Sequence, residues 1–203
     1  MITSLSYFKG LTNISNAEDT APNSNLLGNV SEAQLFLEEY ERDVLTKSLG
    51  YSLYKDLKSN LETLSGATVE TVKSSAAQKY KDLMSGKEYT IDGVLVHWRG
   101  LLFTEGALKR SLITYYTFFY FLESDLSRHS GIGLQTEKGK NSKKADPRPK
   151  ALRAWSKFYE LTVESRDNEK SLYQFIEDMN KLDSSTYPDW RPYEFGRRNL
   201  WSI

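Results

Sequence analysis

The sequence predicts a mainly α-helical fold: a helical bundle of about five helices with one small β-hairpin and an extended C-terminal tail. Apolar residues recur at helical spacing through most of residues 31–186. Asp92-Gly93 lies between two short β-prone runs and gives the one convincing hairpin signal. Residues 187–203 hold two Trp, two Tyr, one Phe and three Arg but show no periodicity, so they are expected to form a tail.

The composition favours one soluble domain. The 203 residues, 39% of them hydrophobic, suffice for a single core with appendages. The 27 basic residues balance the 27 acidic ones, so the net charge does not support wholesale nucleic-acid binding. The absence of Cys excludes disulfides and thiolate metal sites. No membrane span is expected, because the most apolar run, Leu112 to Leu122, is about half the roughly 20 residues a span needs.

The first elements follow from capping and spacing. Residues 1–30 are expected to form a loosely packed N-terminal arm, since Asn23-Ser24, Pro22 and Gly28 interrupt them. The core domain, residues 31–186, begins at Ser31, which makes a capping-box pattern with Gln34. The first helix is expected to end at Gly50. Apolar spacing then predicts a second helix through Leu53, Leu57 and Leu61, and a third through Val69, Val72, Ala76, Tyr80 and Leu83, ending near Ser85-Gly86.

The middle of the chain holds the hairpin and the longest periodic segment. The hairpin is expected over residues 88–98, with Asp92-Gly93 as a type I′ turn. A helix is expected from about Leu101 to Leu126, because apolar residues alternate by threes and fours apart from the skipped Glu105. Its second half is apolar all round, so this helix is expected to be central in the bundle or to contact another subunit.

Residues 130–150 break the periodicity and hold six basic residues against two acidic ones, which predicts a mobile basic loop. Its candidate DNA-facing residues are Lys138, Lys140, Lys143 and Lys144, each acting on phosphate through salt-sensitive counterion release. Pro147 and Pro149 then open a last long helical region, which is either one bent helix or two. It ends at Tyr187, because the residue before a proline is pushed out of the helical region.

The tail, residues 187–203, is the candidate docking element. Aromatic and guanidinium groups are the side chains most enriched at protein–protein hot spots, so an extended segment that carries them is expected to dock into a groove. That groove belongs either to the same domain or to a neighbouring subunit, and the tail is expected to lie outside the folding core. The candidate docking residues are Tyr187, Trp190, Arg191, Tyr193, Phe195, Arg197, Arg198 and Trp201.

No constellation of residues predicts a catalytic residue, a metal site or a cofactor. Neither His97 nor His129 has a second histidine near it in sequence, and no Cys is present to complete a zinc site. Residues 133–140 fail as a phosphate-binding loop, since position 134 is Leu and Asn141 replaces the magnesium-binding hydroxyl. Six acidic residues are expected on solvated helix faces or opposite a basic partner: Glu38, Glu39, Glu41, Asp43, Glu177 and Asp178.

Two parts of the chain resemble a known family. The segment from Leu35 to Leu45, running into Leu49 to Tyr54, is similar to the opening helices of small head-tail connector, or neck adaptor, proteins of tailed bacteriophages. The likeness is to those that infect Bacteroidetes, including crAss-like phages. Trp98-Arg99-Gly100-Leu101 and the aromatic run from Leu112 to Leu122, followed by a Gly-containing polar loop, resemble the later part of that pattern. The resemblance covers roughly residues 35–155.

This resemblance implies a structural virion protein without enzymatic activity. Its subunits are expected to form a ring, typically of twelve copies, below the portal, where the ring extends the DNA channel and joins capsid to tail. The expected partners are other copies of the chain, the portal protein, other neck and tail proteins and, nonspecifically, double-stranded DNA; no membrane contact is expected. The expected location is the virion neck, after synthesis in the host bacterial cytoplasm. In this family the C-terminal segment commonly reaches the portal or an adjacent subunit, which suits the tail.

The residues also leave a second interpretation open. A nucleic-acid-associated packaging or regulatory factor would use the basic loop of residues 130–150, although the zero net charge weakens that interpretation. An enzyme ranks third, because no group of residues joins a nucleophile, a base and an orienting side chain.

Overall fold

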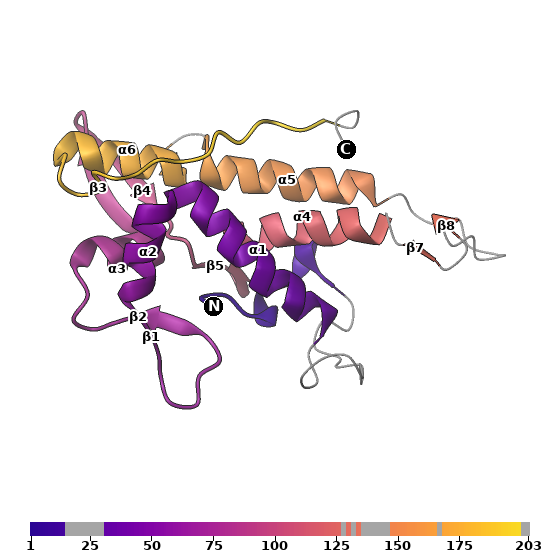
Figure 1. Ribbon diagram of the computed structural model, residues 1–203. Helices are drawn as coiled ribbons and strands as arrows, with labels where there is room; N and C mark the ends of the chain where they lie inside the picture. The colour runs from indigo at the N-terminus through magenta and orange to yellow at the C-terminus, as the bar shows by residue number, and fades with distance from the viewer. Residues whose placement is uncertain (15–30, 127–128, 131–132, 135–146, 166–167, 200–203) are drawn as a thin grey trace.

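The computed structural model describes residues 1–14, 31–126, 129–130, 133–134, 147–165 and 168–199, in which helices alternate with short strands (Figure 1). The helices are α1 (Glu32–Leu49), α2 (Tyr51–Ser59), α3 (Gln78–Ser85), α4 (Leu112–Leu126), α5 (Arg148–Thr162) and α6 (Leu172–Leu182), with 3-10 turns η1 (Leu5–Tyr7) and η2 (Gly10–Thr12). The strands are β1 (Leu61–Thr63), β2 (Glu70–Val72), β3 (Lys87–Ile91), β4 (Val94–Trp98), β5 (Phe103–Glu105), β6 (Leu108–Arg110), β7 (His129–Ser130), β8 (Gly133–Leu134) and β9 (Glu169–Lys170).

The expected mainly helical bundle with one hairpin is wrong. The described residues are 50% helical and 15% strand, with seven strands in three sheets besides the two-residue strands β7 and β8, so the fold is mixed α/β. β1 pairs with β2 and β5 with β6, both antiparallel. The third sheet has the order β3-β4-β9, in which β9 runs parallel to β4.

Two stretches with helix-like spacing form hairpins instead. Leu61 begins β1 and pairs with Val72 of β2, so α2 ends at Ser59 and α3 begins only at Gln78. Leu108 lies in β6, and the β5–β6 hairpin turns at Gly106, whose φ is 60°. An apolar residue at every third or fourth position also suits two short strands, because a three-residue strand needs only one inward side chain to hold it on the core.

Most other element boundaries coincide with the expected capping and turn residues. The Ser31 side chain accepts the Gln34 N–H at 3.1 Å, and Gly50 ends α1 with a φ of 77°. Asp92 and Gly93 have φ values of 52° and 77° and join β3 to β4, which confirms the type I′ hairpin. Pro147 precedes α5, as expected. The last helical region is two helices, α5 and α6, separated by β9.

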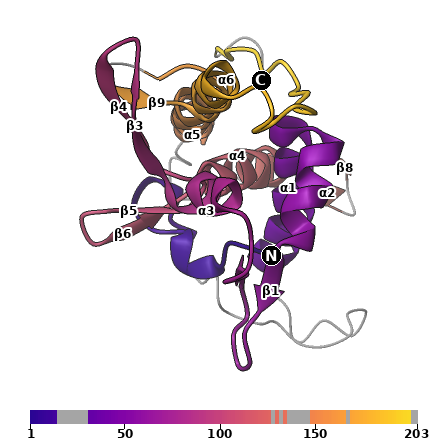
Figure 2. The same ribbon diagram turned by 90° about the vertical axis from the view of Figure 1, so that its left-hand side faces the viewer.

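The core lies where α4 packs between α1 and α5 (Figures 1 and 2). All residues of α4 from 112 to 119 are buried, with Phe118 and Phe119 at most 1% exposed. The next two residues, Tyr120 and Phe121, are only partly buried. The expected burial on every side therefore holds for the first half of this helix and not for the second.

The first residues pack on the core, which differs from the expected loose arm. Ile2 and Phe8 are each 1% exposed. The Glu41 carboxylate, itself 5% exposed, accepts the N–H groups of Ile2 at 2.7 Å and Thr3 at 3.0 Å, and also the Thr3 hydroxyl. These donors satisfy a buried carboxylate that was expected on a solvated helix face or opposite a basic partner, and that expectation is wrong for Glu41. The remainder of the expected arm, residues 15–30, lies outside the described residues.

Candidate functional site

The tail is described for residues 187–199 and runs as an extended segment from the end of α6 back along α6 and α5 (Figure 1). Besides α6, its hydrogen bonds reach three other helices. The Tyr187 hydroxyl donates to the Lys79 carbonyl of α3 at 2.7 Å. The Trp190 indole donates to the Ser48 carbonyl of α1 at 3.0 Å, and the Trp155 indole of α5 donates to the Gly196 carbonyl at 3.0 Å. The tail therefore fastens α1, α3 and α5 to one another.

Two tail aromatics belong to the hydrophobic core. Tyr187 is 2% exposed and Phe195 is 7% exposed. The Phe195 ring lies 4.9 Å from the Phe158 ring of α5 and 6.1 Å from the Tyr116 ring of α4, measured between centroids. These contacts overturn the expectation that the tail lies outside the folding core, because removing either ring would open the core itself.

The groove beneath the tail contacts its main chain. The Tyr193 N–H donates to the Lys47 carbonyl at 2.7 Å, and the Tyr173 hydroxyl donates to the Tyr193 carbonyl at 2.6 Å. At Gly50, a Cβ atom would lie 2.7 Å from the Arg191 carbonyl oxygen, so only glycine leaves room for the tail there. Gly50 thus does two things: it ends α1 and it seats the tail.

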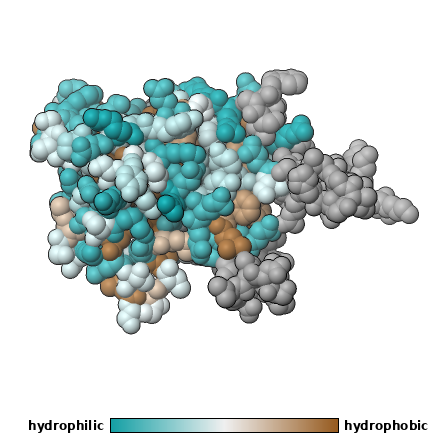
Figure 3. Space-filling view, in the orientation of Figure 1, coloured by the Kyte–Doolittle hydropathy of each residue, from teal (hydrophilic) through white to brown (hydrophobic). Residues whose placement is uncertain are grey.

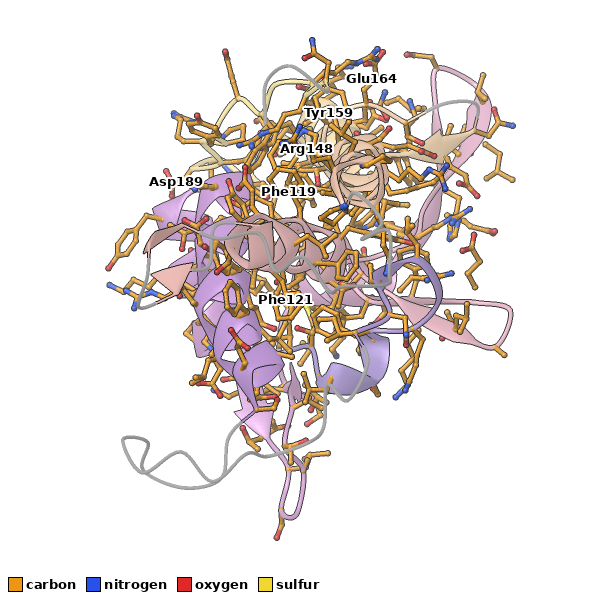
Figure 4. All side chains as sticks on the ribbon, turned by 90° about the vertical axis from the view of Figure 1, so that its right-hand side faces the viewer. Phe119, Phe121, Arg148, Tyr159, Glu164 and Asp189 are labelled. Atoms are coloured by element: carbon orange, nitrogen blue, oxygen red, sulfur yellow. The ribbon has the colours of Figure 1, made fainter. Side chains whose placement is uncertain are left out.

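The tail arginines stack on aromatic rings. The Arg198 guanidinium lies 4.4 Å from the Trp155 ring centroid and 4.7 Å from that of Phe119, and it pairs with Glu123 at 3.4 Å. Arg197 lies 5.3 Å from the Tyr159 ring and bonds to Glu164, two residues that Figure 4 shows near each other at the top of the molecule. Stacking of this kind is worth about 0.5 to 2 kcal/mol per pair.

The eight candidate docking residues therefore divide by exposure. Tyr187 and Phe195 point into the core, and Trp190 and Arg198 are partly buried against it. Three side chains face outward: Arg191, Tyr193, which is 58% exposed, and Arg197. Trp201 lies outside the described residues. Among the described candidates, the outward set offers the most surface to a partner that meets the docked tail.

A polar network around Asp43 lies under the tail. Asp43 accepts the Tyr116 hydroxyl at 2.6 Å and the Lys47 ammonium at 2.8 Å. Burial and the hydrogen bond to Asp43 raise the pKa of the Tyr116 hydroxyl, so this group stays protonated and donates. A cleft of about 350 Å³ adjoins these groups and includes Tyr193 and Arg198 among its lining residues.

The other acidic residues also divide. Glu38, Glu39 and Glu177 are exposed, as expected. Asp178 instead is 5% exposed, accepts the Tyr89 hydroxyl at 3.0 Å and pairs with Lys170 at 3.4 Å, because it lies on the face of α6 that covers the β3-β4-β9 sheet. The helical spacing of these acids is compatible with either orientation, so it does not distinguish a buried carboxylate from a solvated one.

A second aromatic surface lies beside the tail, between α1 and the end of α4. Tyr40 stacks on Tyr120 with ring centroids 4.6 Å apart, and Phe36 meets Phe121 edge-on at 5.4 Å. All four rings are partly exposed. Figure 3 shows a small hydrophobic area near α1 on an otherwise mostly hydrophilic face. Among the described residues, these rings form a partly exposed surface shared by α1 and α4.

The remaining candidates give no site. Lys138, Lys140, Lys143 and Lys144 lie outside the described residues. His97 lies in β4, where its main-chain N–H donates to the Asn168 carbonyl at 2.9 Å. His129 lies in β7. Over the described ranges, no group of three or more His, Asp or Glu side chains is arranged to hold a metal ion. No helix in that part of the chain is long and apolar enough to span a membrane.

Comparisons of the chain with protein-family models, curated proteins and solved structures gave no match. The sequence predicts the tail but not the groove that receives it, which is built from Lys47, Ser48, Gly50, Trp155 and Tyr173. The one available signal is Gly50, and it also has an ordinary explanation as a helix stop. The groove comes from three separate parts of the chain, which sequence periodicity cannot bring together.

Proposed function

We propose that the chain is a structural subunit of a bacteriophage neck, a head-tail connector or adaptor that acts without enzymatic activity. Copies of it form a ring, typically of twelve, below the portal, where the ring extends the DNA channel and joins capsid to tail. Its partners are other copies of itself, the portal protein, neighbouring neck and tail proteins and, nonspecifically, double-stranded DNA. It is made in the cytoplasm of the host bacterium and resides in the virion neck.

The observation that carries this proposal is the way the tail is held. An extended segment with three separate aromatic contact points, at Tyr187, Trp190 and Phe195, lies in a groove that binds its main chain. The connection before it, residues 183–185, is exposed. Such a groove accepts the same segment from a second copy with the same contacts, so exchange between copies links subunits at low cost. The resemblance of residues 35–155 to connector proteins supports the same conclusion.

The test uses the absence of Cys from the sequence. Tyr193 and Lys47 are adjacent through the main-chain bond of 2.7 Å, so Lys47→Cys and Tyr193→Cys place two thiols side by side. The two single variants are mixed, allowed to assemble and oxidised. We expect disulfide-linked dimers of one variant with the other, seen on a non-reducing gel, because the tail of one copy occupies the groove of the next.

The double variant Lys47→Cys/Tyr193→Cys is the matched control, because it forms the same bond within one chain if the tail stays on its own domain. An internal bond in the double variant, with no mixed dimers from an assembled mixture, would show that the tail only fastens its own domain. Mixed dimers that also appear with Tyr51→Cys in place of Lys47→Cys would show random collision, since Tyr51 is 71% exposed and its side chain has no described contact with the tail.

A further inference from the structure

A basic surface extends away from the tail, beginning at Lys157, which lines a cleft together with Arg197 and Arg198 of the tail. It consists of five exposed cations from three elements or their flanks, and it is called the basic face below: Lys9, Lys109, Lys150, Arg153 and Lys157. Figure 2 and Figure 4 both show α5, the N-terminal turns and the β5–β6 hairpin along one side, with the tail toward the other.

Printed contacts join these cations through the N-terminal turns. Arg110 of β6 donates to the Lys9 carbonyl at 3.1 Å. The Lys109 ammonium lies 5.8 Å from the Tyr7 ring centroid, and the Lys150 ammonium donates to the Asn13 carbonyl at 3.3 Å. Residues 7–13 therefore carry β6 on one flank and the start of α5 on the other, which makes the basic face continuous.

The α5 part of the basic face is a stripe. Lys150, Arg153 and Lys157 follow one another at intervals of three and four residues, so they lie on one side of the helix. The opposite side of α5, with Ala151, Trp155 and Thr162, is buried. At 1.5 Å per residue the three cations span about 10 Å of helix. Arg110 and Lys157 both lie close enough to Tyr115 to lower its pKa, although burial has the larger effect and raises it.

The charge of this region contrasts with that of the whole chain. With Arg110, the region holds six basic residues, against the acidic Glu105 and Glu160 that pair with Arg110 and Lys157. The excess is four positive charges in a chain whose net charge is zero. A local excess of one sign raises the concentration of oppositely charged partners at that surface.

We propose that the basic face binds the phosphate backbone of duplex DNA without reading its bases. The proposal rests on the function proposed above and names the side of the subunit that faces the DNA channel. DNA is favoured over an acidic protein because a protein contact needs apolar anchors. The large apolar side chains that the described residues expose are elsewhere: Leu35, Tyr51, Leu64, Val94, Leu95, Leu182 and Tyr193.

The test compares two triple variants with the same change of charge. The first, Lys9→Gln/Lys109→Gln/Arg153→Gln, removes cations from the basic face. The second, Arg42→Gln/Lys55→Gln/Lys181→Gln, removes equally exposed cations from α1, α2 and α6. Binding of a fluorescently labelled duplex of arbitrary sequence is measured by anisotropy at several salt concentrations. The mass of each assembly is measured in parallel, and melting curves check that both variants fold.

We expect the first variant to bind the duplex more weakly and to lose about 2.7 from the slope of log affinity against log salt, since each lost phosphate contact removes about 0.9. The second variant should keep the slope of the unmodified chain. If both variants lose the same affinity and the same salt slope, the effect comes from net charge alone and the proposal is overturned. The proposal is also overturned if the unmodified chain does not bind DNA. Polyglutamate serves as an acidic polymer for comparison. If the first variant loses affinity for polyglutamate but keeps its affinity for the duplex, the partner is an acidic protein and not DNA.

The two proposals fail separately. Assembly of normal mass without DNA binding would overturn the role of the basic face and leave the connector function in place. DNA binding by a chain that never assembles would overturn the connector function instead.

Discussion

Gly100→Ala is expected to destabilise the fold by roughly 3 to 5 kcal/mol, seen as a large fall in the urea midpoint. Gly100 has a φ of 95°, and a Cβ atom there would lie 2.6 Å from the Gly86 nitrogen and from the Met84 carbonyl oxygen. Both of these are main-chain atoms, so no side chain can rotate away to make room. Residues 98–102 therefore pass very close to residues 83–86. The hydrogen bond from the Leu101 N–H to the Leu83 carbonyl at 3.0 Å holds the two segments together.

Gly106→Ala is the matched control for the backbone effect alone. Gly106 has a φ of 60°, but nothing lies within 4 Å of a Cβ atom built there. Gly106→Ala should lower the free energy of unfolding by only about 1 to 2 kcal/mol, which is the cost of a left-handed conformation for an L-residue. Equal losses at the two glycines would show that the close crossing of residues 83–86 and 98–102 is not a constraint on the fold.

Phe195→Ala is expected to lower the free energy of unfolding by about 3 kcal/mol and to weaken assembly. The ring is 7% exposed and packs on Phe158, Tyr116 and Trp155, so its removal leaves a cavity where the tail meets the core. Chemical denaturation measures the first effect, and sedimentation at a temperature where the variant is folded measures the second.

Tyr193→Ala separates the core contact from the exposed one. The Tyr193 side chain is 58% exposed, and the bonds that hold this residue in the groove come from its main chain, which the substitution retains. Its free energy of unfolding should change by less than about 1 kcal/mol. A loss as large as that of Phe195→Ala would mean that the whole tail, and not the buried ring, stabilises the domain.

Local residue chemistry predicts much of the fold. Ser31, Gly50, Asp92-Gly93 and Pro147 each have a conformational preference that does not depend on distant contacts, and each marks a boundary where the structure has one. Leu61 and Leu108 are predicted wrongly because an apolar side chain anchors a short strand as well as a helix. Gly106 has a left-handed φ and forms the turn between β5 and β6. The helix-like spacing of the apolar residues around it does not reveal this turn.

The tail shows a different limit. The absence of periodicity correctly predicts an extended segment but not its burial, because Tyr187, Trp190 and Phe195 enter three different places on the core. The sequence does not reveal the basic face either, because its residues come together only in the folded chain. Lys9, Lys109 and Lys150 are far apart in sequence, and only the packing of residues 7–13 between β6 and α5 brings them together.

Most of the basic face lies on a different side of the molecule from the tail (Figure 2), and only Lys157 lines a cleft that tail residues also line. A ring subunit needs this arrangement, since one side meets the DNA in the channel while other surfaces meet neighbouring copies and the portal. In a ring, each subunit presents one surface to the preceding copy and a different one to the next, and the groove and the tail are such an unlike pair.

The native mass of the purified full chain, measured without DNA over a range of protein concentrations, tests the connector function most directly. A chain of 23.3 kDa that closes into a ring of twelve gives an assembly of about 280 kDa, and closure predicts that the mass stops growing with concentration. The account predicts one such discrete assembly. A chain that stays monomeric at every concentration and gains mass only on a salt-sensitive complex with duplex DNA would contradict it.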